Sequence, residues 1–250
     1  MDEEMMFEMS AGSLEGLPSV GEMFDLTGKV AVVSGTIGLA LSVIYRLASC
    51  GAKVVFGARR ETVGQMAEER LREMGLDVRF HKLDVSSVES CREIVAFAEQ
   101  TYGTVDIVVP VAAAFFARAF VDIKESEYDR IVDVDQKGQY FLVQAAARSM
   151  IRGKKGGKVV TVASVAYRGE DMPKLAMMTA YNTAKAGVVG MTRGIAKELK
   201  QYGINVNCVA PGVMVTPGAI FNNTTTAELY GPEWTRYVTE YGAGVPVAPN

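Results

Sequence analysis

Short runs of β-branched and other apolar residues alternate along the chain with segments whose apolar positions recur at helical spacing. These runs predict strands at residues 29–34, 53–57, 78–83, 105–109, 157–163 and 204–209. The segments between them predict helices at residues 39–51, 61–75, 87–103, 125–152 and 180–203. Because the strands are apolar on both faces, the alternation predicts one parallel sheet with helices on both sides, a doubly wound α/β fold.

Glycines follow four of the predicted helices, where a left-handed residue closes the last helical turn. They are Gly51, Gly75, Gly103 and Gly203. No internal repeat or low-complexity linker interrupts the alternation, so residues 28–250 are expected to form one domain. Residues 1–27 contain Met, Glu, Gly and Ser without a clear period and are expected to be an N-terminal extension.

The composition argues against several classes of protein. Hydrophobic residues make up 49% of the 250 residues, which is enough for a substantial core. The formal charge is -3, with 26 basic against 29 acidic side chains, so no nucleic-acid partner is expected. No apolar run approaches the ~18 residues of a membrane span, and the acidic N-terminus is unlike a signal peptide. We therefore expect a cytoplasmic protein that does not contact a membrane.

Two further patterns are not expected to carry function. The three cysteines Cys50, Cys91 and Cys208 lie far apart, and the chain has a single histidine, His81, so no metal site is expected. The basic run at residues 148–158 is expected to be a solvated loop.

The turn after the first predicted strand is a candidate binding site for a phosphate group. In a doubly wound sheet a dinucleotide pyrophosphate binds there, because glycines let the backbone approach and the helix offers free N–H groups. The candidate residues are Ser34, Gly35, Ile37 and Gly38. A plain tight turn needs the same residues, so this motif by itself indicates either an ordinary turn or a cofactor site.

The end of the second predicted strand bears on which cofactor would bind. Where an acidic residue would hold the adenosine ribose of NAD, the chain has Ala58, Arg59 and Arg60. A guanidinium suits the 2'-phosphate of NADP, so these residues favour NADP, with NAD as the alternative. An ordinary exposed Arg pair that opens a helix would look the same. Asp84 ends the third strand, where it would meet the adenine or cap the helix that starts near Ser87.

Tyr181 and Lys185 are four residues apart in a predicted helix, so their side chains lie on one face. A phenol with a pKa near ~10 is a poor base at neutral pH, but a neighbouring ammonium group stabilises the phenolate and lowers that pKa. The pair is therefore a candidate acid/base couple, although many helices contain such a pair by chance.

Ser164 follows the fifth predicted strand, and the segment VAPGVMVTP overlaps the end of the sixth. Together with Tyr181 and Lys185, these features resemble the short-chain dehydrogenase/reductase family over about residues 29–216. The resemblance implies a Rossmann fold and a hydride exchanged between NADP or NAD and a small-molecule carbonyl or secondary alcohol substrate. It implies that Tyr181 exchanges the proton at the substrate oxygen and that Ser164 hydrogen-bonds this oxygen. Lys185 would lower the Tyr181 pKa and bind the nicotinamide ribose.

The resemblance also implies further cofactor contacts and an assembly. Asp84 and Val85 match the pair that contacts the adenine. The segment after the sixth strand would contact the nicotinamide, through Pro211, Gly212, Val213 and Thr216. Residues 216–250 would form a substrate lid and a C-terminus that stops before the family's last helix and strand. The expected assembly is a homodimer or a homotetramer.

Three departures from the family pattern face the expected cofactor. The first turn is three residues shorter than the family's TGxxxGxG, which would pull the helix toward the sheet or unwind its first turn. The family's NNAG is replaced by PVAA at residues 110–113, where Pro110 is expected to end its strand. Asp135 stands where the family has a catalytic-site Asn; it would hold a water beside Lys185 and, if close, raise the Tyr181 pKa. These departures leave an alternative open, a catalytically impaired relative with a binding or assembly role.

Overall fold

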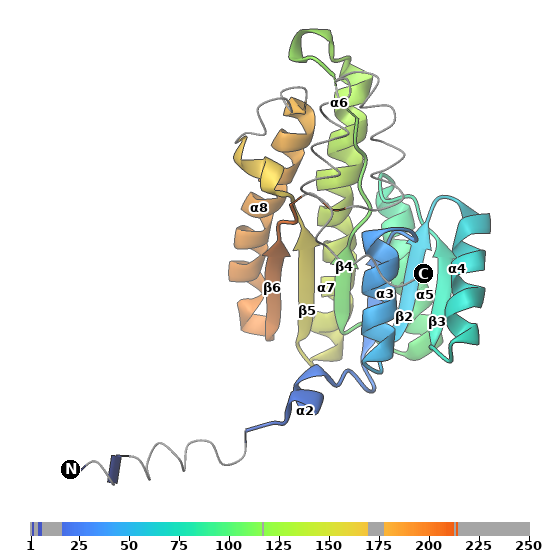
Figure 1. Cartoon of the computed structure of the whole chain (residues 1–250), viewed down its shortest axis with the longest axis vertical. Helices are drawn as coiled ribbons and strands as arrows, with labels where there is room; N and C mark the ends of the chain where they lie inside the picture. The colour runs from blue at the N-terminus through green and yellow to red at the C-terminus, as the bar shows by residue number, and fades with distance from the viewer. Residues whose placement is uncertain are drawn as a thin grey trace.

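The computed structural model describes residues 2, 5–6, 17–116, 118–169, 178–212 and 214. Within them lies one parallel sheet with the strand order β3-β2-β1-β4-β5-β6 (Figure 1). The strands are β1 Val30–Ser34, β2 Lys53–Ala58, β3 Val78–Lys82, β4 Ile107–Pro110, β5 Gly157–Val162 and β6 Ile204–Val209. This sheet confirms the predicted doubly wound α/β fold, and each strand lies within two residues of its predicted position.

The helices cover both faces of the sheet (Figure 1). Their bounds are α2 Val20–Phe24, α3 Leu39–Ser49, α4 Glu61–Glu73, α5 Val88–Tyr102, α6 Glu125–Val132, α7 Gly138–Gly153 and α8 Thr179–Leu199. Short helical turns are η1 Phe120–Asp122, the π-helical η2 Asp133–Lys137, η3 Val165–Arg168 and η4 Lys200–Tyr202. Helices α3 and α4 pack on one face, and α5, α7 and the end of α8 pack on the other.

The alternation of side chains along β1 explains why the sheet has a core on each face. Val30 and Val32 belong to the cluster formed with α5 and α7. Ala31 and Val33, which point the opposite way, belong to the cluster formed with α3 and α4. All five residues of β1 are buried, as expected for a central parallel strand, so every apolar residue in it contributes to one core or the other.

Three details differ from the sequence-based predictions. The helix predicted over 125–152 is interrupted by η2, where the chain takes a π-helical turn between α6 and α7. The basic run at 148–158 is not a solvated loop, because residues up to Gly153 continue α7 and Gly157 begins β5. The N-terminal extension contains α2, whose start is stabilised by a capping box between Ser19 and Glu22.

Two predictions about how strands and helices end are confirmed. Pro110 is the last residue of β4 and pairs with Ser34 at the end of β1, so its missing N–H costs no interior hydrogen bond. The four glycines expected to follow helices all have positive φ, between 70° and 94°. Of the helices in the described residues, none is long and apolar enough to cross a membrane.

Candidate active site

The carboxyl ends of the parallel strands bring the candidate residues to one edge of the sheet. Ser34 ends β1, Arg59 follows β2, Asp84 follows β3 and Ser164 follows β5. The strand order reverses between β1 and β4, and ligands of doubly wound folds bind in the crevice at such a switch point. The fold therefore places residues that are far apart in sequence along one edge of the sheet.

Tyr181 and Lys185 lie on the same face of α8, as predicted. The Lys185 ammonium lies 5.4 Å from the centroid of the Tyr181 ring. Its Nζ donates a hydrogen bond to the Val162 carbonyl at the end of β5, at 3.0 Å. The Lys185 side chain is only 1% exposed, so its charge needs a partner in the interior.

Asp135 supplies that partner. Its Oδ1 lies 3.0 Å from the Lys185 Nζ, and neither side chain is more than 1% exposed. The Oδ1 atom is within ion-pair distance but makes no well-directed hydrogen bond, whereas Oδ2 accepts one from the Ala114 N–H at 2.7 Å. The carboxylate and the ammonium are therefore in direct contact as an ion pair.

The π-helical turn and a glycine bring the pair together. Asp135 is the middle residue of η2, and π-helical turns are frequent at functional sites because they displace side chains from the regular helical positions. Gly187 faces this turn from α8. A Cβ on Gly187 would lie 2.6 Å from the Gln136 side chain, which is too close for any other residue without movement. The end of the Gln136 side chain therefore lies against α8 at Gly187.

The surroundings of the Tyr181 hydroxyl disfavour its ionisation. Burial raises the Tyr181 pKa well above its ordinary value, the negative charge of Asp135 raises it further, and Ser164 lowers it to a smaller extent. Burial also raises the pKa of Asp135, and Lys185 opposes that shift. The net shift of the Tyr181 pKa is therefore upward, opposite to the lowering expected from Lys185, because partial burial is its largest cause and Asp135 adds to it.

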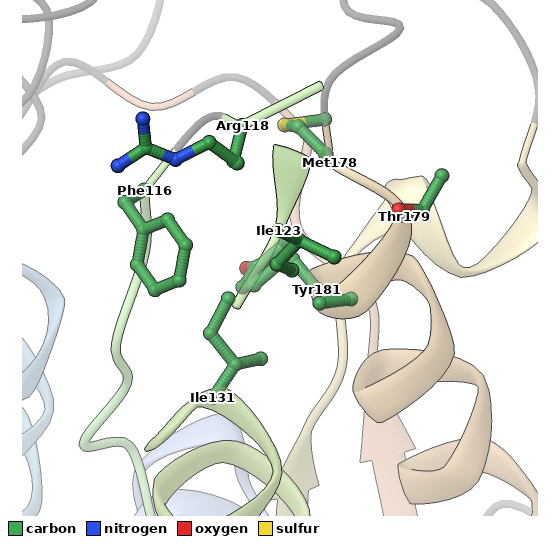
Figure 2. A pocket seen from close by; sticks show the side chains of 8 residues that line it. Phe116, Arg118, Ile123, Ile131, Met178, Thr179 and Tyr181 are labelled. Carbon is green, nitrogen blue, oxygen red and sulfur yellow. The ribbon is translucent and has the colours of Figure 1, made fainter. Parts of the chain in front are cut away.

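Ser164 and a small hollow adjoin Tyr181. Ser164 is the N-cap residue of η3, and its Oγ accepts a hydrogen bond from the Ala166 N–H at 3.2 Å. The ring of Phe115 contacts the Tyr181 ring edge-on, with centroids 5.3 Å apart. Figure 2 shows the hollow, across which Phe116 and Ile131 face each other. Its lining residues are Phe116, Arg118, Ile123, Ile131, Met178, Thr179, Ala180 and Tyr181.

The loop after β4 is braced from two sides although it lacks the family's NNAG. The Ala112 N–H donates to the Ser34 Oγ at 3.0 Å, and the Ala114 N–H donates to Asp135. Ser34, a predicted cofactor contact, is fully buried, and its side chain is used for this internal bond. The loop is therefore positioned by β1 and by η2 together.

Substitution of Ser34 by alanine is expected to destabilise the protein by about 1–3 kcal/mol, because it leaves the Ala112 N–H without its acceptor. Urea unfolding of the variant measures this loss. Thr101→Ala is the control: Thr101 is exposed, and its Oγ1 bonds only to a carbonyl of its own helix. Equal stability of the Ser34 variant and the wild type would contradict the assigned bond.

The shortened first turn remains compact and leads into an intact helix. Gly35 has φ +105°, and a Cβ there would lie 2.7 Å from the Ala40 Cβ, so the turn packs directly against the start of α3. The Ser42 N–H donates to the Gly38 carbonyl at 3.2 Å, which shows that the first turn of α3 is formed. Of the two outcomes expected from the deletion, unwinding of the first turn of α3 is not observed.

A comparison with protein-family models identifies this constellation. Residues 29–227 match the model described as short chain dehydrogenase. The chain belongs to the short-chain dehydrogenase/reductase family. Members of this family are oxidoreductases that use a nicotinamide cofactor, and this chain is an oxidoreductase of that kind. Nothing in the comparisons favours the alternative of an impaired relative.

Two relatives and one solved structure illustrate the similarity. Galactitol 2-dehydrogenase of Agrobacterium fabrum is 34% identical over 194 residues, covering 76% of this chain and 72% of the relative. Tropinone reductase-like 3 of Erythroxylum coca is 33% identical over 199 residues, covering 79% and 73%. The crystal structure of an actinorhodin polyketide ketoreductase variant with NADPH superposes with a TM-score of 0.79 at 27% identity, covering 87% of this chain and 83% of that chain.

The remaining cofactor candidates of this family member lie around the same crevice. Ile37 and Arg59 are exposed, and Gly38 precedes α3. Asp84 does not cap α5, because its Oδ1 accepts from the N–H and hydroxyl of Ser86, while Ser87 caps the helix. Val85 is buried beneath α7.

The segment after β6 reaches the loop that follows β5. The Pro211 carbonyl accepts a hydrogen bond from the Val165 N–H at 3.0 Å, next to Ser164, and Gly212 is exposed beside it. The predicted contacts Val213 and Thr216, and the predicted lid at 216–250, lie outside the described residues.

The turn after β1 and the start of α3 fit a nicotinamide dinucleotide. No side chain caps the amino end of α3, so its first N–H groups remain available to a phosphate. Gly35 presents bare backbone beside these groups, where a side chain would collide with Ala40. No group of three or more His, Cys, Asp or Glu that would suit a metal is found in the part of the chain that the structure describes.

The sequence reasoning missed Gln139. This residue is 1% exposed, and its amide both donates to the Val162 carbonyl, at 2.8 Å, and accepts from the Val162 N–H, at 3.1 Å. Val162 is the residue whose carbonyl also binds Lys185. A polar Gln at a buried position of α7 was the available signal, but its partner on β5 is known only from the fold.

Proposed function

We propose that this protein is an NADP-preferring oxidoreductase that interconverts a small-molecule carbonyl compound and a secondary alcohol. The observation that carries the proposal is the placement of Tyr181 beside Lys185 and near Ser164, at the carboxyl edge of the sheet. These are the residues that the family uses for proton exchange at a substrate oxygen. The names of the relatives, a galactitol dehydrogenase, a tropinone reductase-like protein and a polyketide ketoreductase, support a substrate of this class.

Each residue has a distinct role in the proposed reaction. Bound NADPH supplies the hydride for carbonyl reduction. Tyr181 gives its hydroxyl proton to the substrate oxygen. Ser164 donates a hydrogen bond that orients this oxygen, and Lys185 binds the ribose side of the cofactor.

The preference for NADP rests on the residues that follow β2. Arg59 and Arg60 are both exposed there, where an NAD-specific protein carries a carboxylate for the ribose hydroxyls. A guanidinium binds a phosphate through two charge-assisted hydrogen bonds. The cofactor contacts of Ser34, Gly35, Ile37, Gly38, Asp84, Val85, Pro211, Gly212, Val213 and Thr216 belong to the same proposal.

Arg59→Ala is expected to weaken NADPH binding about tenfold or more and to leave NADH binding nearly unchanged, because only NADPH carries the 2'-phosphate. Titration of nicotinamide fluorescence with both cofactors measures this. Arg70→Ala is the control, since Arg70 lies on α4 but at its far end, in an exposed pair with Glu73. An equal effect on both cofactors would refute the phosphate role. Absence of saturable binding of either cofactor to the wild type would refute the proposed function itself.

Two further expectations follow from the family. A homodimer or homotetramer is proposed as the assembly, and the cytoplasm as the location. Light scattering coupled to size-exclusion chromatography of the purified chain measures the first directly.

A further inference from the structure

The residue that most distinguishes this active site from its family is Asp135, at a position where the family has an uncharged Asn. An Asn there would leave Lys185 as the only charge beside Tyr181. In this chain the buried carboxylate lies 3.0 Å from the Lys185 ammonium, so a fully buried ion pair stands where the family has a single positive charge. An ion pair has no net charge, and its field falls off faster than that of a lone ammonium.

This inference rests on the proposed function. We propose that Asp135 balances the charge of Lys185 so that Tyr181 stays a neutral phenol. A neutral phenol favours carbonyl reduction over alcohol oxidation at neutral pH. Reduction of a ketone adds a hydride at carbon and a proton at oxygen. NADPH provides the hydride with its two electrons, and the Tyr181 hydroxyl provides the proton. The resulting tyrosinate then takes a proton from solvent. Oxidation needs the reverse, a tyrosinate that accepts the alcohol proton at the start.

The geometry supports a role of Asp135 in charge balance. Its Oδ2 is committed to the Ala114 N–H, which fixes the carboxylate between the β4 loop and Lys185. Its Oδ1 faces the ammonium without a well-directed hydrogen bond, so the contact with Lys185 is mainly electrostatic. Lys185 in turn is held by the Val162 carbonyl. Burial of both groups keeps water from screening the charges.

The other described charges around Tyr181 are paired or exposed. Arg118, at the hollow, pairs with Glu127 of α6 at 2.7 Å, and Asp133 of η2 pairs with Lys137 at 2.9 Å. Arg168 of η3 stacks on the ring of Tyr167. The remaining charged side chains of α6 are exposed, namely Glu125, Asp129 and Arg130. Asp135 is therefore the buried negative charge of this region, and its effect raises the Tyr181 pKa in addition to burial.

The test measures the ionisation of Tyr181 directly, without turnover. The protein has ten tyrosines. With tyrosine labelled by carbon-13 at Cζ, the NMR signal missing from Tyr181→Phe identifies Tyr181, and its shift is followed against pH. In the wild type we expect this signal to remain that of a phenol beyond pH 10.0, the ordinary midpoint of a tyrosine. A wild-type midpoint below that value would overturn the proposal, and this result does not depend on any variant folding.

Asp135→Asn supplies the second measurement. Removal of the carboxylate charge is expected to lower the Tyr181 midpoint by at least about one pH unit. Asp133→Asn removes the same charge two residues away on η2, from an exposed pair, and is expected to leave the midpoint unchanged. Equal midpoints in Asp135→Asn and the wild type would overturn the proposal.

Kinetics with a matched probe pair separate this proposal from the proposed function. Cyclohexanone with NADPH and cyclohexanol with NADP serve as probes at pH 7.5. Asp135→Asn is expected to raise the ratio of kcat for oxidation to kcat for reduction about tenfold, each measured at saturating substrate and cofactor, in line with the lowered midpoint. An unchanged ratio beside a lowered midpoint would overturn the directional role. Failure of the wild type to turn over either probe counts against the proposed function for such substrates, while the NMR midpoints still decide the role of Asp135.

Discussion

Tyr181→Phe is expected to lower the rate of carbonyl reduction by about 10²- to 10⁴-fold, the usual contribution of a positioned general acid. The substitution removes only the hydroxyl. The ring remains and keeps its edge-on contact with Phe115, so the fold and the affinity for NADPH should be nearly unchanged. Steady-state reduction of cyclohexanone and fluorescence titration of NADPH measure the two effects separately.

Tyr140→Phe is the matched control for this prediction. Tyr140 lies on α7, is 41% exposed and contacts the ring of Phe141. Removal of its hydroxyl should change neither rate nor binding. Undiminished turnover in Tyr181→Phe would remove Tyr181 from the mechanism, whereas a parallel loss of NADPH binding would mean that the hydroxyl holds the cofactor rather than the substrate proton.

Lys185→Met is expected to destabilise the protein by about 3–5 kcal/mol, because it leaves the buried carboxylate of Asp135 without its counter-charge. Activity should be lost as well, since the ribose contact disappears. The double variant Asp135→Asn with Lys185→Met removes both charges and is expected to recover most of the stability but none of the activity. Urea unfolding of the wild type, the single variants and the double variant measures this coupling.

The loss of stability in Lys185→Met should depend on pH. Burial raises the Asp135 pKa in the folded protein above its unfolded value, and removal of Lys185 raises it further. The folded state then binds the proton more tightly than the unfolded state, so stability falls as pH rises through the folded pKa. The variant should therefore be more stable in mild acid than at neutral pH.

Lys137→Met provides the matched control for the buried pair. Lys137 pairs with Asp133 on the same helical turn, but both side chains are about 40% exposed, and such a pair contributes less than about 1 kcal/mol. Equal losses in Lys137→Met and Lys185→Met would contradict the stabilising role of the buried ion pair. Failure of the double variant to recover stability would show that Lys185 acts through packing rather than charge.

Part of the candidate site was predictable because its signals are local. The spacing of Tyr181 and Lys185 places both on one face of a helix whatever surrounds it, and their proximity is confirmed. Ser164 follows a strand, so its position at the carboxyl edge follows from the alternation of strands and helices. The position of Pro110 at the end of β4 was predictable for a similar reason, since a central strand needs its N–H groups.

The electrostatics of the site were not predictable in the same way. The sign of the shift in the Tyr181 pKa depends on burial and on the distance of Asp135, and both arise from the packing of η2 against α8. The direct ion pair joins Asp135 and Lys185, which are fifty residues apart in sequence. The hydrogen bond between the Ala112 N–H and the Ser34 Oγ likewise joins the loop after β4 to the end of β1.

The sequence by itself determined the alternation of strands and helices, the parallel sheet and the residue types at its carboxyl edge, because hydrophobic periodicity and turn chemistry act over short distances. Tertiary structure alone decided which of these residues share a buried environment. It joined Asp135 to Lys185, turned Ser34 inward to Ala112, and partly buried Tyr181. Burial and charge separation are properties of the packed chain, since they depend on groups that the fold brings together from distant segments.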